Sequence, residues 1–238
     1  MELKNNTFKI LFNKSDNDLA QAMLCKLEEQ KVELMQFFDI EKLSDNITIK
    51  IYDDIDKFKE FVNKSFKKQA DFFKKQGKNV PCRTWEKWIR AMAGNGKIDM
   101  LNIELAKTET THKNTNLENA LQVAVHELVH ICHAEIIKKP LPAYLMEGIA
   151  TQLANQKFYQ LEKIECNAND LLNNFYKLDK GYHSAYTLLG YMQEKFKHEE
   201  LLEILSGEKE PDLENLITET NLYLETKNQD DNKKQSQM

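Results

Sequence analysis

The sequence has 238 residues, of which 41% are hydrophobic and 30% are charged, enough apolar material for one domain with a substantial core. Its formal net charge of −5 argues against nucleic acid or an anionic membrane as the main partner. No run of about 18 apolar residues occurs and the N-terminus lacks an apolar signal region, so we expect a cytoplasmic protein without a membrane span.

The first part of the chain alternates between strand-like and helix-like patterns. An apolar stretch at 7–12 predicts a short strand, and Asp16 or Asp18 then begins a helix. Residues 47–52 alternate between apolar and polar side chains and predict a strand, after which Asp53 begins a second helix. This β-α-β-α order indicates an N-terminal mixed sheet covered by helices.

The basic segment 74–90 contains two tryptophans, Trp85 and Trp88. We expect them to pack on the sheet; a flap over a substrate cleft is the alternative. A turn at 94–96 follows, and then an alternating stretch at 98–105 that predicts a further strand. We place this strand at the edge of the sheet, where an extended peptide could add to it through backbone hydrogen bonds.

The pentapeptide His126-Glu127-Leu128-Val129-His130 is the motif around which the chain is organised. Residues four apart on a helix share one face, so the two imidazoles can bind one metal ion. The intervening glutamate lies about 100° round the helix, within reach of a water molecule on that metal. This H-E-x-x-H pattern is typical of zinc-assisted hydrolysis.

The flanking residues predict the helix that the motif requires. Thr115 and Glu118 fit a capping box, with Thr115 as the N-cap. Neither glycine nor proline interrupts the chain from there to Lys138. An apolar stripe lies on the face away from the two histidines and consists of Leu117, Leu121, Val125, Leu128, Cys132 and Ile136.

A catalytic zinc ion usually has a third protein ligand, and two residues compete for this place. His133 shares the face of His126 but lies about 10 Å from it along the helix axis, too far for three side chains of one straight helix to converge. The chain breaks at Pro140 and Pro142, and a new helix carries Glu147, followed by Gly148. We expect this helix to pack close against the motif helix at that glycine and to bring Glu147 beside the histidines.

The motif histidines, a Leu-Pro turn and the later Met-Glu147-Gly-Ile-Ala together resemble the gluzincin metallopeptidases, specifically the peptidase MA-like group. The resemblance spans residues 8–224, although its specific motifs lie between His126 and Tyr191. It implies that His126, His130 and Glu147 bind Zn²⁺ and that Glu127 is the general base. One departure is Thr151, where such families often have an acidic residue.

The resemblance also extends to a tyrosine-rich helix after Gly181. In the family, a tyrosine at this place donates a hydrogen bond to the oxyanion of the tetrahedral intermediate. Alignment of the motifs favours Tyr186 for this role, with Tyr182 and His183 as alternatives.

We therefore predict an α+β, zincin-like fold in a single domain, 1–226, with a sheet lobe at 1–115, a helical lobe at 116–226 and a disordered tail at 227–238. The predicted function is zinc-dependent hydrolysis of peptide or protein substrates. The alternatives are a zinc hydrolase acting on other substrates, a zincin-fold binding protein without turnover, and a purely structural module. The four scattered cysteines predict reduced, mostly buried thiols.

Overall fold

A computed structural model describes residues 1–43, 46–75, 77 and 81–235, and the fold is α+β as predicted. The chain forms two compact units, Met1–Glu33 with Glu41–Ile131, and Leu34–Ile40 with Cys132–Met238. The division after Ile131 falls inside one helix, later in the chain than the division at 115 that we expected from the sequence. Across the described ranges, no helix is both long enough and apolar enough to cross a membrane.

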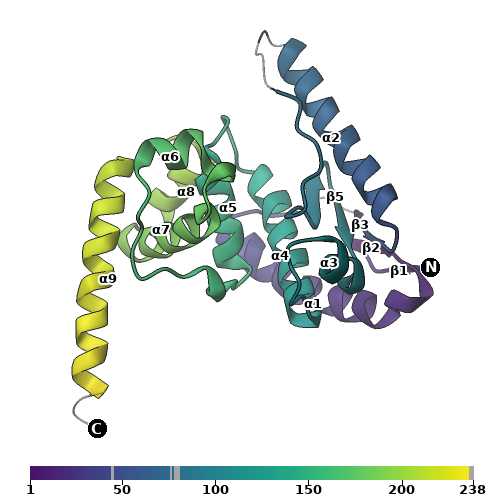
Figure 1. Cartoon of the computed structure of the whole chain (residues 1–238), viewed down its shortest axis with the longest axis horizontal. Helices are drawn as coiled ribbons and strands as arrows, with labels where there is room; N and C mark the ends of the chain where they lie inside the picture. Colours follow the sequence, from purple (N-terminus) through teal and green to yellow (C-terminus); the bar gives the residue numbers. More distant parts are fainter. Residues whose placement is uncertain (44–45, 76, 78–80, 236–238) are drawn as a thin grey trace. The chain divides into compact units, whose positions relative to one another are not determined.

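The first unit contains a five-stranded mixed sheet in the order β1-β2-β3-β5-β4 (Figure 1). The strands are β1 (Glu2–Lys4), β2 (Phe8–Leu11), β3 (Ile47–Tyr52), β4 (Ala91–Gly94) and β5 (Lys97–Leu101). β2, β3 and β5 run parallel, while β1 and β4 pair antiparallel at the two ends. The alternation at 47–52 is confirmed, because Ile47, Ile49 and Ile51 are all buried.

The stretch 98–105 differs from its predicted single strand. β5 ends at Leu101, and Asn102 then accepts a hydrogen bond from the Leu105 N–H as the N-cap of α3 (Ile103–Glu109). β5 pairs with β3 on one side and β4 on the other, so its prediction as an edge strand is wrong. Within the sheet that the structure describes, β4 occupies that edge. The local cap outweighs the alternating pattern, since it satisfies a helical N–H that a strand would not offer.

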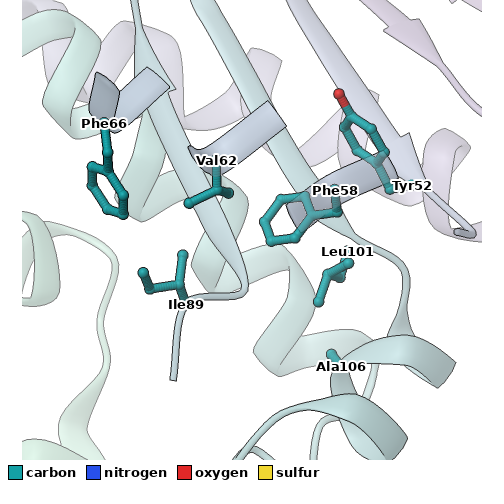
Figure 2. Close-up of a cluster of buried hydrophobic side chains, with 7 residues drawn as sticks. All are labelled: Tyr52, Phe58, Val62, Phe66, Ile89, Leu101 and Ala106. Atoms are coloured by element: carbon teal, nitrogen blue, oxygen red, sulfur yellow. The ribbon is translucent and has the colours of Figure 1, made fainter. Parts of the chain in front are cut away.

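Helix α2 (Ile55–Lys75) packs on the sheet through its apolar face. Figure 2 shows the resulting cluster, in which side chains of α2 face residues of the sheet, of the segment before β4 and of α3. Its members are Tyr52, Phe58, Val62, Phe66, Ile89, Leu101 and Ala106. Trp85 and Trp88 are half-buried and pack against this cluster, which contains Tyr52 and Leu101 of the sheet. Residues 76 and 78–80 of the basic segment lie outside the described residues.

The motif helix α4 (Leu117–Ala134) begins with a different cap from the predicted one. The Asn119 N–H donates to Asn116 Oδ1 at 2.9 Å, which makes Asn116 the capping residue. Thr115 instead donates its hydroxyl hydrogen to the His112 carbonyl. The predicted N-cap, Thr115, is therefore wrong by one position, although the helix itself is present. Leu117, which we placed in the apolar stripe, is exposed.

The second unit is built from helices. They are α5 (Ala143–Leu153), α6 (Ala168–Asn173), α7 (Gly181–Lys195), α8 (His198–Ser206) and α9 (Leu213–Gln235), with the short 3₁₀ turns η2 (Lys157–Tyr159) and η3 (Phe175–Lys177). Helix α1 (Asn17–Phe37) of the first unit ends in it. α5 packs along α7, and the Gln152 side chain donates to the Tyr186 carbonyl.

Gly148 lies at a close approach of α5 to α7. A Cβ added there would lie 2.7 Å from Leu189 Cδ2 and 2.9 Å from the Ala185 carbonyl oxygen. The glycine thus permits a close approach, as predicted, but the nearest atoms belong to α7 rather than to the motif helix.

We expect Gly148→Ala to destabilise the protein by about 1–3 kcal/mol, because a methyl group would push against backbone that cannot rotate away. Gly94→Ala is the matched control, since a Cβ added there meets nothing within 4 Å. Chemical denaturation of both variants measures the difference. Equal stability of the two would contradict the tight packing described for Gly148.

The end of the chain also differs from its prediction as a disordered tail. α9 continues as a helix through Gln235, and residues 236–238 lie outside the described residues. Four of its apolar side chains are buried, those of Leu213, Leu216, Ile217 and Leu224, whereas that of Leu222 is exposed. In Figure 1, α9 passes α6 and α7 and then extends beyond them. The residues from Glu225 to Gln235 are all polar or charged, so this part of the helix carries no apolar face.

The cysteines are free thiols, but the prediction that most are buried is wrong. Cys25 and Cys82 are exposed, Cys166 is half-buried, and Cys132 is buried. Burial raises the pKa of the Cys132 thiol to about 12, so this thiol stays protonated at neutral pH.

Candidate metal centre

Helix α4 places the two motif histidines one turn apart with their rings in contact. The ring centroids lie 4.8 Å apart at 82°, and His126 Nε2 lies 3.1 Å from His130 Nε2. His126 is buried and His130 is half-buried. Two ring nitrogens at this separation either share a proton or face a common third atom that both can bind.

Glu147 lies in the first half of α5, which begins after Pro142. Its side chain is buried, with 8% exposed. One ligand atom from each of His126, His130 and Glu147 lies within 4.8 Å of the others. In the part of the chain that the structure describes, this group could hold a metal ion.

The donor chemistry of the group fits a divalent metal ion. Two neutral imidazoles and one carboxylate supply three donors with a single formal negative charge, which a divalent cation would overcompensate. Their burial makes an unneutralised carboxylate costly, so a cation at this place has a physical reason to bind.

His133 is not part of the metal group and makes its contacts with other residues. It is buried, with 1% exposed, and its Nε2–H donates to the Leu205 carbonyl at 2.8 Å. Its ring stacks on Phe38 with centroids 5.4 Å apart. These contacts give His133 a packing role, in line with the expectation that it is not the third ligand.

Glu127 follows His126 on α4 and is buried, with 7% of its surface exposed. A carboxylate in this setting can accept a proton from a nearby donor.

The residues considered for the oxyanion lie on α7. Tyr186 is buried, and burial raises the pKa of its hydroxyl, so it keeps the proton that a hydrogen-bond donor needs. Tyr182 is stacked on Tyr159 with centroids 5.8 Å apart. Burial lowers the pKa of His183, with a further contribution from Lys180, so this imidazole is neutral at pH 7. Tyr186 adjoins Ala185, whose carbonyl defines the close approach to Gly148.

One residue at this centre was missed by sequence reasoning. The Tyr176 hydroxyl donates a hydrogen bond to Glu147 Oε1 at 2.9 Å. Tyr176 lies on η3, 29 positions from Glu147, in a segment with no readable motif. No sequence signal singled it out, because the contact depends on how η3 packs against the helices around it.

Thr151, the departure from the family pattern, has a local explanation. It is fully buried, and its hydroxyl lies within hydrogen-bond distance of the carbonyl oxygens of Glu147 and Gly148. The side chain is therefore satisfied by the backbone of its own helix.

No protein-family model matches this chain, and neither the curated proteins nor the solved structures contain a match. The resemblance to the gluzincins is therefore confined to the motifs between His126 and Tyr191.

Proposed function

We propose that this protein is a zinc-dependent peptidase. The observation that carries the proposal is the group of His126, His130 and Glu147, with donor atoms within 4.8 Å of one another, on the sequence H-E-x-x-H. A donor set of two histidines and one glutamate is one that catalytic zinc sites use, with one position left for water.

The separation of the two histidines fits the geometry of a bound zinc ion. With Zn–N bonds of about 2.0–2.1 Å, two nitrogens on a tetrahedral ion lie about 3.3–3.4 Å apart. The 3.1 Å between the Nε2 atoms of His126 and His130 is close to that value. Zinc binding would therefore need only a small adjustment of the two rings.

A bound zinc ion would act as a Lewis acid and lower the pKa of a coordinated water to about 7. The protein's own groups would handle protons and charge. Glu127 would accept a proton from the attacking water and later return it to the leaving amine. Tyr186, protonated because burial raises its pKa, would donate a hydrogen bond to the oxyanion, with Tyr182 and His183 as alternatives.

The test is cleavage of a mixed peptide library by the zinc-loaded full chain, read by mass spectrometry. We expect new peptide termini that disappear with a zinc chelator and return when zinc is restored. Zinc bound without any cleaved peptide would contradict the peptidase proposal, and would leave a zinc hydrolase with other substrates or a zinc-binding protein without turnover.

A further inference from the structure

We infer that Tyr176 is a positioning residue for the metal ligand Glu147. Its hydroxyl donates to Glu147 Oε1 at 2.9 Å, within the unit to which both residues belong. The inference deepens the proposed function and rests on it, since it assigns how the third ligand of the same centre is held ready.

The turn that carries Tyr176 is fixed by its own contacts. In η3, the Lys177 N–H donates to the Asn174 carbonyl at 2.7 Å, and Phe175 beside Tyr176 is buried. A Cβ added to Gly181 would lie 2.5 Å from the Phe175 carbonyl oxygen, so the start of α7 abuts the backbone of η3. The phenol therefore extends from a backbone that has little room to move.

The ring of Tyr176 is also supported. It meets Phe175 edge-on with centroids 5.1 Å apart and lies 6.5 Å from the ring of Tyr182. These ring contacts do not need the hydroxyl, so removing the oxygen alone should leave the ring where it is. The hydroxyl can then be tested separately from the packing.

The chemistry of the carboxylate explains what the hydrogen bond does. A carboxylate has two oxygens with about four acceptor positions, and a free one can rotate between several orientations. When the Tyr176 hydroxyl donates to Oε1, it restricts the rotation of the carboxylate and so sets the orientation of the group. Groups that hydrogen-bond to a metal ligand typically contribute about 10–100-fold to metal affinity by orienting it.

The test is the zinc affinity of Tyr176→Phe, measured by competition with a chromophoric chelator, together with the visible absorption spectrum of the cobalt-substituted protein. We expect zinc binding about 10–100-fold weaker and a changed cobalt spectrum, with thermal unfolding of the metal-free protein nearly unchanged. Tyr191→Phe is the matched control, because it removes a hydroxyl bonded to Glu219 at 3.4 Å, a carboxylate outside the metal group.

A double-mutant cycle shows whether Tyr176 acts through Glu147. In a Glu147→Ala background, Tyr176→Phe should weaken zinc binding no further, since the group that it orients is gone. Equal affinity of wild type and Tyr176→Phe, or equal weakening in both backgrounds, would overturn the inference. Absence of zinc binding by the wild type would overturn both this inference and the proposed function. Weakened binding by Tyr176→Phe without peptide cleavage would support the inference and refute only the peptidase.

Discussion

Glu127→Gln is expected to reduce peptide hydrolysis about 10²–10⁴-fold while leaving zinc affinity nearly unchanged. Glutamine has the size and polarity of glutamate but cannot accept the proton of the attacking water. Glu127 is buried next to His126, so an amide of the same shape should preserve the packing. Steady-state kinetics on a peptide identified in the library experiment, with zinc titration of the same samples, separates the two effects.

Glu118→Gln is the control for this experiment. It makes the same substitution on the same helix, at an exposed position in the first turn of α4. We expect wild-type turnover from it, since exposed substitutions away from a site usually change little. Full activity in Glu127→Gln would show that another group is the base. Loss of zinc from Glu127→Gln would show that Glu127 belongs to the metal site itself.

His130→Ala is expected to weaken zinc binding about 10²–10³-fold. Zinc sites with four ligands bind with about 10–16 kcal/mol, so one ligand contributes on the order of 2.5–4 kcal/mol. The measurement is the same chelator competition that is used for Tyr176→Phe.

His133→Ala, three residues further on the same helix, should give the opposite result. It removes the hydrogen bond to the Leu205 carbonyl and the stacking on Phe38, so it should lower the free energy of unfolding by about 1–3 kcal/mol without changing zinc affinity. A large loss of zinc affinity in His133→Ala, with little loss in His130→Ala, would show that His133 is the metal ligand and His130 the packing residue.

Regular periodicity made part of the fold predictable. β3 is predicted by the alternation over 47–52, which matches its buried isoleucines. α5 is predicted by the apolar spacing after Pro142, although the helix is buried on nearly all sides. The stretch 98–105 failed for the opposite reason. Its alternation continued past Leu101, but the backbone followed the asparagine cap at Asn102, whose contribution is local and outweighs a short pattern.

Some residues of the candidate site could also be predicted from the sequence, and one could not. The two histidines could be predicted because a helix fixes the geometry of residues four apart. Glu147 could be predicted because it lies in the Met-Glu-Gly-Ile-Ala segment that follows them. Tyr176 could not be predicted, because its hydrogen bond to Glu147 depends on how Phe175 and Gly181 pack around η3. Contacts between segments without a shared period leave no local signal in one sequence.

The metal site is tested most directly by the metal content of the wild-type protein, purified without chelator under zinc-replete conditions and measured by elemental mass spectrometry. We expect about one zinc per chain, retained through gel filtration. A metal-free, folded protein would contradict this expectation, and His126, His130 and Glu147 would then have a structural role only.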